Sequence, residues 1–464
     1  MKPYSEYKKS DSKLTNKIPK NWAEASLKRT VDGCVNGIWG NEPDGKNDIA
    51  CIRVADFDRA SNSISTEKLT FRSVSYSERA NRLVKSGDLL IEKSGGGDKT
   101  LVGAVAIFQH DFDAVTSNFV AKMSPYTGYS ARFLNYCFSA LYSSNINYCS
   151  IKQTTGIQNL DSEAYLQEKV GVPSYSEQQK IAQFLDYETA NIDALIDEQK
   201  RLIELLKEKR QAVVSHAVTK GLNPDVPMKD SGVEWLGEVP EHWNIIPLKH
   251  IAKLNPSKSE YTGSKSALCT FIPMEKLKTN CLELDENRTI SEVYLGYTYF
   301  REGDVLFAKV TPCFENRNTA VASNLTNGIG FGSSEINVFR PYKVAARFMY
   351  YRLLEDVLVN FWTSEMTGAG GLKRVPSNVI ENYLIALPNA TEQEKIASYL
   401  DDRIQKMDEL SSEAKHNVEL LEERRSALIS AAVTGKIDVR DWQPPAGSDT
   451  VDSNASVQTE RHYG

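Results

Sequence analysis

The sequence lacks the closely spaced ligands that most metal sites and disulfide frameworks require. Its seven cysteines are scattered and include no CxxC pair, and its six histidines include neither HxxxH nor HExxH. Zinc sites are usually built from such motifs, and disulfide frameworks belong mainly to oxidising compartments. We therefore expect no metal site, and we expect the cysteines to be buried free thiols in a cytoplasmic protein.

Long apolar runs and an excess of positive charge are also missing. No stretch of 18 apolar residues occurs, and the opening MKPYSEYKKSDSK has no apolar segment, so we expect neither a membrane span nor a signal peptide. The formal net charge is −6, whereas nucleic-acid-binding proteins usually carry a basic surface. Any nucleic-acid site must therefore depend on local clusters of basic residues.

The chain contains two copies of one plan. With 464 residues and 41% hydrophobic content, it is long enough for two to four folded units. Residues 173–219 and 388–434 align without gaps and share 22 of 47 positions, and weaker matches precede them in the same order. These pair IPKNWAEASLK with VPEHWNIIPLK and VKSGDLLIEK with FREGDVLFAK. A spacing of about 215 residues indicates a duplicated domain rather than a solenoid.

Each strongly matching segment is predicted to be one long helix. Capping boxes are expected at Ser176 with Gln179 and at Thr391 with Glu394, and Gly221 and Gly435 are expected to end the helices. Apolar residues recur at steps of three and four, as in a coiled-coil seam. The predicted helix–helix interface comprises Leu185, Ile192, Leu195, Leu202, Leu206, Val213, Leu400, Met407, Leu410, Leu421 and Leu428.

The divergent blocks before the helices are predicted to be globular domains of mixed α and β structure. Apolar strands such as LLIEK and DVLFAKV alternate with turn residues, and one short helix follows in each block. The predicted fold class is α+β (mixed α/β). Two globular domains are separated by two long antiparallel coiled-coil helices of roughly 60 Å each, related by a pseudo-two-fold internal repeat.

A glycine-rich loop, SGGGDKT, resembles a phosphate cradle but fails the test for one. A Walker loop needs Lys directly after Gly and a helix next, whereas Asp98 separates Gly97 from Lys99 and an apolar strand follows. The equivalent place in the second copy reads VTPCFENR, without glycine. A loop whose chemistry differs between two copies of one scaffold is typical of recognition rather than of nucleotide hydrolysis.

These divergent loops offer side chains that suit phosphates and bases. Lys and Arg bind phosphate or guanine, and Asn pairs with adenine. A second loop in each copy, KQTTGIQN and TGAGGLKR, carries further polar residues close to glycines. The candidate DNA-binding residues are Lys93, Ser94, Lys99, Thr100, Lys152, Gln153, Thr154, Lys309, Thr311, Arg317, Asn318, Lys373 and Arg374.

The layout resembles the specificity (S) subunit of Type I restriction-modification systems. The resemblance rests on the PxxW starts at Pro19 and Pro240, the GDxL strands, the two helix starts PSYSEQQKIAQFLD and PNATEQEKIASYLD, and the junction DSGVEWLGEVPEHW. It implies two target recognition domains, over 1–172 and 240–387. Long helices follow over 173–222 and 388–437, with a linker over 223–239 and a disordered tail over 438–464.

The resemblance also implies a function and a set of partners. Each recognition domain would read one half of a bipartite double-stranded DNA target, and the helices would set the spacing and dock two modification (M) subunits. The M subunit would bring S-adenosylmethionine, and a restriction (R) subunit would bring ATP and Mg. The chain itself shows no NPPF, NPPY or DPPY methyltransferase motif and no Walker motif. We therefore expect it to be non-catalytic, without a cofactor of its own.

Two other interpretations remain open from the sequence. A coiled-coil scaffold that binds only proteins would account for the helices and the acidity, and sequence-dependent DNA binding would exclude it. An enzyme that uses Glu315 with Lys309 is the second alternative. Activity without any partner would support it.

Overall fold

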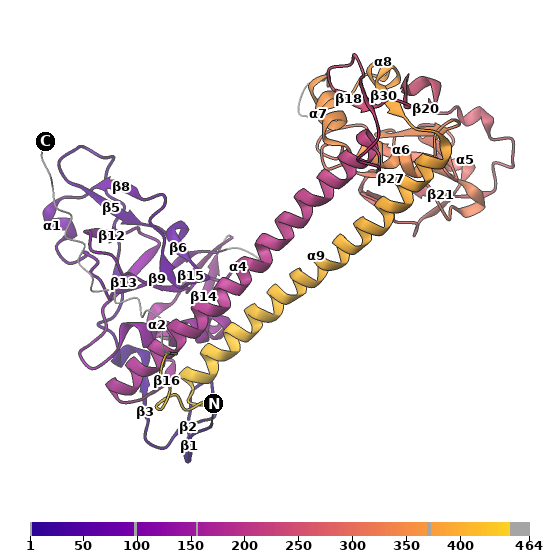
Figure 1. The fold of residues 1–464 in the computed structure, drawn as a ribbon. Helices are drawn as coiled ribbons and strands as arrows, with labels where there is room; N and C mark the ends of the chain where they lie inside the picture. The colour runs from indigo at the N-terminus through magenta and orange to yellow at the C-terminus, as the bar shows by residue number, and fades with distance from the viewer. Residues whose placement is uncertain (1, 97–99, 155, 369–372, 446–464) are drawn as a thin grey trace, which may run out of the picture. The chain divides into compact units, whose positions relative to one another are not determined.

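The computed structural model describes residues 2–96, 100–154, 156–368 and 373–445, which fall into two compact units. Unit 1 comprises Met1–Glu198 with Asn417–Gly464, and unit 2 comprises Gln199–His416. Two long helices, α4 (Tyr175–Lys220) and α9 (Ala390–Val433), each contribute one segment to each unit (Figure 1). The mixed α and β fold class with long helices is therefore confirmed.

The long helices begin slightly earlier than predicted. Ser174 accepts a bond from the backbone nitrogen of Glu177, and Asn389 accepts one from the backbone nitrogen of Glu392. These residues cap α4 and α9 in place of the predicted Ser176 and Thr391, because each supplies a short side-chain oxygen just before the first turn. Gly221 follows α4 with a φ of +79°, as predicted for a helix end.

Within each unit the two helices are joined by the same ion pair. In unit 1, Asp193 of α4 accepts from Arg425 of α9 at 2.8 Å. In unit 2, Arg210 of α4 donates to Asp408 of α9 at 2.7 Å. Both pairs join equivalent residues, because Asp193 aligns with Asp408 and Arg210 with Arg425. The internal repeat therefore gives the same contact in each unit. The arginine comes from α9 in unit 1 and from α4 in unit 2.

Three residues of the predicted apolar seam are exposed, and the others are buried or half-buried. Leu185, Ile192, Leu400 and Met407 are buried, and Leu206, Val213, Leu421 and Leu428 are half-buried. Leu195, Leu202 and Leu410 are 45%, 39% and 50% exposed. On α4, Ile196 is buried instead of Leu195, one residue and about 100° further round the helix. A strict heptad pattern drifts against the 3.6-residue helix turn, which explains the misassigned positions.

Unit 1 is built around a sheet that places the first variable loops at its strand ends. The strand order is β4-β13-β9-β11-β7-β6, and all four residues of β9 are buried. These strands are β4 (Val35–Asn36), β13 (Val120–Met123), β9 (Leu89–Glu92), β11 (Val105–Ile107), β7 (Ser63–Ile64) and β6 (Phe57–Asp58). The remaining sheets are β12 (Ala114–Thr116) with β5 (Asp48–Ile52) and β8 (Thr70–Ser73); β10 (Ser94–Gly95) with β15 (Ile157–Leu160) and β14 (Ile151–Thr154); β1 (Tyr7–Lys9) with β2 (Lys17–Pro19); and β3 (Ala23–Ser26) with β16 (Lys169–Val172). Its short helices are α1 (Tyr76–Arg79), α2 (Ala131–Ser143) and α3 (Ser162–Tyr165).

Unit 2 repeats this central pairing with β26 and β29 in the places of β9 and β13. Val305–Ala308 pairs antiparallel with Ile336–Phe339, as Leu89–Glu92 does with Val120–Met123. Its larger sheets are β20 (Ala252–Leu254), β29 (Ile336–Pro341), β26 (Val305–Ala308) and β27 (Thr319–Val321), and β24 (Asn287–Thr289), β21 (Leu268–Ile272), β28 (Ile329–Gly332) and β25 (Thr298–Arg301). The smaller ones are β17 (Met228–Asp230) with β18 (Glu238–Pro240), β19 (Asn244–Pro247) with β30 (Leu384–Leu387), and β22 (Leu277–Lys278) with β23 (Cys281–Leu282). The short helices are α5 (Ile290–Val293), α6 (Ala346–Leu353), α7 (Asp356–Ser364) and α8 (Ser377–Asn382).

A buried tryptophan fixes each globular part to the start of a long helix. The indole nitrogen of Trp22 donates to Glu177 of α4 at 2.9 Å, and that of Trp243 donates to Glu392 of α9 at 3.1 Å. Both tryptophans are at most 1% exposed, and each acid lies in the first turn of its helix, where the positive end of the helix dipole favours a carboxylate.

The predicted linker and tail contain more structure than expected. In the linker region, β17 and β18 form a hairpin, and Trp235 stacks on Tyr383 with ring centroids 5.4 Å apart. The start of the predicted tail is also ordered, because Val439 is fully buried and Trp442 packs on Phe184. These segments are polar in overall composition, but their few aromatic side chains pack against the folded units. The rest of the predicted tail, from residue 446, lies outside the described residues. The domain boundaries themselves stay a prediction.

The cysteines are free, as expected, but they are not all buried. Cys51, Cys137 and Cys269 are buried, whereas Cys149 and Cys281 are exposed. Burial raises the pKa of Cys51 and of Cys269 to about 11, which keeps these two thiols protonated. Among the described residues, no helix is long and apolar enough to cross a membrane.

Two leucines of α9 provide a test of the corrected seam. Leu400→Ala should lower the free energy of unfolding of unit 2 by about 2–5 kcal/mol, because Leu400 is fully buried. Leu410→Ala should cost less than about 1 kcal/mol, because that side chain is half exposed. Urea unfolding of the full chain, followed by circular dichroism, compares the two variants. Equal losses would contradict the seam described above.

Candidate nucleic-acid interface

In unit 1 the candidate residues gather at the end of β9. Lys93 directly follows this strand, and its ammonium group donates to Asn36 at 2.8 Å. Ser94 begins β10, which pairs with β15 so that Ser94 lies opposite Asn159. On the other side of β15, Lys152 of β14 lies opposite the same Asn159. The two sequence segments that carry candidates in this unit are therefore brought together on one sheet.

Two hollows lie beside this sheet and share Ser94. One, of about 460 Å³, is lined largely by polar residues: Asn36, Gly37, Lys93, Ser94, Asn118, Asn159 and Leu160. The other, of about 340 Å³, is lined by Trp39, Arg53, Val54, Ala55, Ser94, Gly95, Gly96, Ser117, Phe119 and Ile157. Phe119 and Ile157 are 54% and 53% exposed. The surface thus combines hydrogen-bonding groups with exposed apolar side chains, as base recognition requires.

Other predicted residues of unit 1 contribute less. Gln153 is exposed on β14, and Thr100 is exposed after the glycine loop. Lys152 is 75% exposed and forms an ion pair with Asp161 at 2.7 Å. Lys99 lies outside the described residues, and so does the side chain of Thr154.

In unit 2 the structure brings four predicted residues into one cluster. Lys309 directly follows β26, and its backbone nitrogen donates to Glu335 at 2.8 Å. Thr311 is in backbone contact with Lys373, whose nitrogen also donates to the Thr311 hydroxyl at 3.4 Å. Arg374 forms a bridge with Val310, between Lys309 and Thr311. We call Lys309, Thr311, Lys373, Arg374 and the adjoining Glu335 the second-domain cluster.

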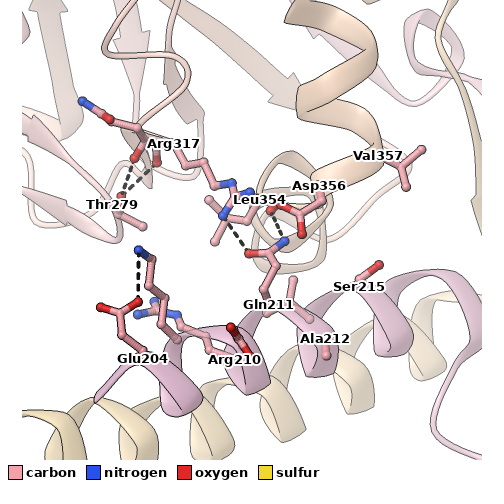
Figure 2. Close-up of a pocket in the computed structure, with 14 residues that line it drawn as sticks. Glu204, Arg210, Gln211, Ala212, Ser215, Thr279, Arg317, Leu354, Asp356 and Val357 are labelled. Carbon is pink, nitrogen blue, oxygen red and sulfur yellow. Dashed lines mark hydrogen bonds and ion pairs between the residues drawn. The ribbon is translucent and has the colours of Figure 1, made fainter. Parts of the chain in front are cut away.

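Arg317 is engaged in contacts with helices of its own unit. Its guanidinium donates to Gln211 of α4 at 2.8 Å and forms an ion pair with Asp356 of α7 (Figure 2). These residues line a groove of about 830 Å³ between α4 and the loops of unit 2. Its neighbour Asn318 is half-buried, and its backbone accepts from Ala308. Among the described residues, neither Arg317 nor Asn318 bonds to the second-domain cluster, so the predicted set is divided between two places.

Three positions correspond between the units. Lys93 matches Lys309, each directly after the central strand. Phe119 matches Glu335. The backbone oxygen of Phe119 accepts from the backbone nitrogen of Lys93 at 2.8 Å, and that of Glu335 accepts from Lys309 at the same distance. Asn159 matches Arg374. Asn159 pairs with Ser94, which follows Lys93, and Arg374 pairs with Val310, which follows Lys309. The sequence prediction omitted Asn159, although it ends the segment KQTTGIQN as Arg374 ends TGAGGLKR. Asn36, Phe119 and Glu335 carried no sequence signal, because their place depends on strand pairing.

In each unit an acidic neighbour stabilises the positive charge of one candidate residue. Hydrogen bonding to Asp161 raises the pKa of Lys152, and hydrogen bonding to Glu335 raises the pKa of Arg374. Both side chains therefore remain cationic at neutral pH. Cationic groups at strand ends suit the phosphates of a nucleic acid.

Two features that an enzyme site could use are missing from the described residues. No group of three or more His, Cys, Asp or Glu side chains among them is placed to hold a metal ion. No hydrogen bond or ion pair joins Glu315 with Lys309 in the described part of the chain. The alternative enzyme site drawn from the sequence therefore gains no support from these contacts.

Comparison with known families gives a match over most of the chain. The sequence profile of the family described as Type I restriction modification DNA specificity domain matches residues 59–205 and 240–420. The two matched segments correspond to the two copies of the internal repeat.

Curated relatives are similar over shorter or more divergent stretches. The Type I restriction enzyme EcoEI specificity subunit of Escherichia coli is 38% identical over 163 residues, which cover 34% of this chain and 27% of that protein. The EcoAI specificity subunit is 36% identical over 166 residues, again 34% of this chain and 27% of the relative. The chain thus spans about a quarter of the length of these relatives. The EcoKI specificity subunit is 20% identical, with 92% of this chain and 91% of the relative covered.

Solved structures share the fold at low sequence identity. The crystal structure of the HsdS subunit from Thermoanaerobacter tengcongensis superposes with a TM-score of 0.53 at 16% identity, covering 90% of this chain and 98% of that one. A chain from a structure on complex assembly and conformational transition of the type I R-M system reaches a TM-score of 0.63, also at 16% identity, covering 90% and 99%.

Replacing the two equivalent lysines tests the interface. Lys93→Ala and Lys309→Ala should each weaken duplex DNA binding by the full chain several-fold, because each removes a cation from a strand end. The slope of log K against log salt should fall by about 0.9 for each phosphate that the variant no longer neutralises. Fluorescence anisotropy over a range of salt concentrations measures both quantities.

Lys406→Ala is the matched control, because Lys406 is an exposed lysine of unit 2 that pairs with Asp402 on α9. Binding by this variant should stay close to wild type. Equal slopes for all three variants and the wild type would exclude Lys93 and Lys309 as phosphate contacts.

Proposed function

The chain belongs to the Type I restriction-modification DNA specificity family, and from this premise we propose that each globular domain reads one half of a bipartite DNA target. The family membership confirms the resemblance drawn from the sequence. It also confirms that the chain is a specificity subunit, which is non-catalytic.

The proposal rests on the observation that both domains share one strand arrangement but carry different side chains on it. Both domains place a lysine after the central strand, Lys93 or Lys309, next to two positions that differ in chemistry. Those positions hold Phe119 and Asn159 in the first domain, and Glu335 and Arg374 in the second. Two domains that recognise different half-sites need the same phosphate contact and different base contacts. The lysine suits the first role, and the variable side chains beside it suit the second.

The long helices are proposed to set the spacing between the half-sites. Helices α4 and α9 comprise 46 and 44 residues and carry one equivalent Asp–Arg pair in each unit. A continuous helix has a fixed rise per residue, so its length defines a distance better than a flexible linker does. The spacing of the two half-sites would therefore depend on helix length.

The partners and cofactors follow the same proposal. Double-stranded DNA is the ligand, and two methyltransferase (M) subunits dock on the chain, with restriction (R) subunits joining the assembly. S-adenosylmethionine belongs to the M subunit, and ATP and Mg belong to the R subunit. This chain holds neither and acts in the cytoplasm, where it contributes recognition only. The scaffold alternative lacks DNA recognition, and the following experiment separates the two.

Methylation sequencing tests the proposed function directly. The chain is expressed with the methyltransferase subunit of its own system in a bacterium that lacks DNA methylation, and N6-methyladenine is mapped by single-molecule sequencing. A bipartite motif with a fixed gap should appear, and it should disappear when this chain is omitted. An active methyltransferase, verified in complex with this chain, that gave no such motif would favour the scaffold alternative.

Exchange of one domain provides the second test. Replacing residues 240–387 with the matching segment of a relative of different specificity should change one half of the motif. The other half and the gap should stay the same, because the first domain and both helices are intact. A change in both halves would contradict independent reading by the two domains.

A further inference from the structure

We propose that Arg374, held by Glu335, reads a guanine in the half-site of the second domain, and that Asn159 is the corresponding base-reading residue of the first. The proposal rests on the proposed function and deepens it, because it names the base class and the residue. It is drawn from the geometry of the second-domain cluster and from the correspondence of the two domains.

The guanidinium of Arg374 is oriented by two hydrogen bonds along one edge. Nε donates to Oε2 of Glu335 at 3.2 Å, and Nη2 donates to Oε1 at 2.6 Å. A guanidinium carries five N–H donors in a rigid plane, and this contact uses one on each of two nitrogens. The adjoining edge, formed by Nη1 and the second hydrogen of Nη2, still offers parallel donors. Such a pair fits the O6 and N7 acceptors of guanine in the major groove.

The backbone of Arg374 is fixed as well as its side chain. Its nitrogen donates to Thr367 at 2.9 Å, and Thr367 donates back at 3.0 Å. Glu335 is fixed from the other side, because its backbone oxygen accepts from Lys309 after β26. Yet the Arg374 side chain remains 48% exposed. An exposed group held at both ends loses little conformational entropy when a ligand binds, which favours recognition.

The charges around this pair suit a polyanion such as DNA rather than a basic or neutral ligand. Lys309 and Lys373 adjoin the pair, so three cations share the second-domain cluster with one carboxylate, that of Glu335. An isolated surface ion pair contributes at most about 1 kcal/mol to stability, so stability alone accounts poorly for this pair. The excess of positive charge supplies phosphate contacts, and the oriented guanidinium supplies the specific one.

The first domain carries a different reader at the same place. Asn159 pairs with Ser94 at the position that Arg374 takes beside Val310, and its side-chain oxygen accepts from the Ser94 hydroxyl. An asparagine side chain matches the N6 and N7 groups of adenine. Phe119 takes the place of Glu335, so the first domain has no carboxylate there that would hold an arginine. The two domains are therefore expected to prefer different bases at this position.

A lysine substitution separates base reading from phosphate binding. In the methylation assay with the complete complex, Arg374→Lys should lose the preference for guanine at one position of the second half-site by about 5- to 100-fold. Lysine keeps the charge but lacks the planar pair of donors, so methylation of relaxed sites should persist. If Arg374 contacts only phosphate, Arg374→Lys should leave the motif unchanged, and that result would overturn the proposal.

Three further variants complete the test. Lys373→Ala should lower methylation evenly at all sequences, as expected for a phosphate contact. Glu335→Gln should relax the same position as Arg374→Lys, because the neutral amide cannot hold the guanidinium by charge. Asn159→Ala should relax one position of the first half-site only. Arg288→Gln is the matched control, a half-buried arginine of unit 2 that pairs with Glu286, and it should leave the motif intact.

The outcome is distinguishable from a failure of the proposed function. A bipartite motif in the wild type supports the proposed function, whatever the variants do. The guanine assignment fails if the half-site changed by exchange of 240–387 contains no G·C pair. It also fails if Arg374→Lys reduces methylation evenly without a change of base preference. An intact first half-site in each second-domain variant shows that the complex still assembles.

Discussion

The pairing of the two long helices is the constraint on which the rest of the structure depends, and one ion pair that occurs twice fixes its register. The helices carry an apolar stripe that neither covers alone, so they must pair, yet apolar contacts tolerate sliding. The Asp193–Arg425 and Arg210–Asp408 bonds tolerate it less, because a shift by one turn would separate both pairs. The duplicated sequence gives both bonds at once, since each residue has its equivalent 215 positions away. A fixed register is what the proposed spacing of two half-sites requires.

Contacts of the same repeated kind attach the globular parts to the helices. Arg132 pairs with Asp186 on α4 in unit 1, and Arg347 pairs with Asp401 on α9 in unit 2, each at 2.7 Å. The two Trp–Glu bonds add a second attachment in each unit, and none of these residues belongs to the loops that carry the candidate DNA-binding residues. The loops at the strand ends are therefore free to change while the attachment is kept. This separation explains how one scaffold can carry two unrelated recognition surfaces.

The sequence predicted the long helices and the central strands because these depend on local periodicity, and it predicted the repeat because two segments about 215 residues apart are alike. It was less accurate where three-dimensional packing decides. The single short helix predicted in the second block is divided into α6 and α7, and the apolar seam shifts near Leu195 and Leu410. The site was predicted in part, since Lys309 and Arg374 were named but the contribution of Glu335 was not. Pairing between β26 and β29 and the bridge to Val310 create that site, and neither leaves a local pattern in the sequence.

The acidic net charge is compatible with DNA binding because charges act locally in salt solution. At physiological ionic strength the screening length is about 8 Å, so a phosphate responds mainly to the groups beside it. Helix α9 carries more acidic than basic residues, as in the segment DDRIQKMDELSSE, whereas Lys309, Lys373 and Arg374 share one cluster. The acids of α9 would also discourage DNA from binding along that helix. Net charge therefore says little about this protein, and the placement of three or four cations beside variable side chains says much more.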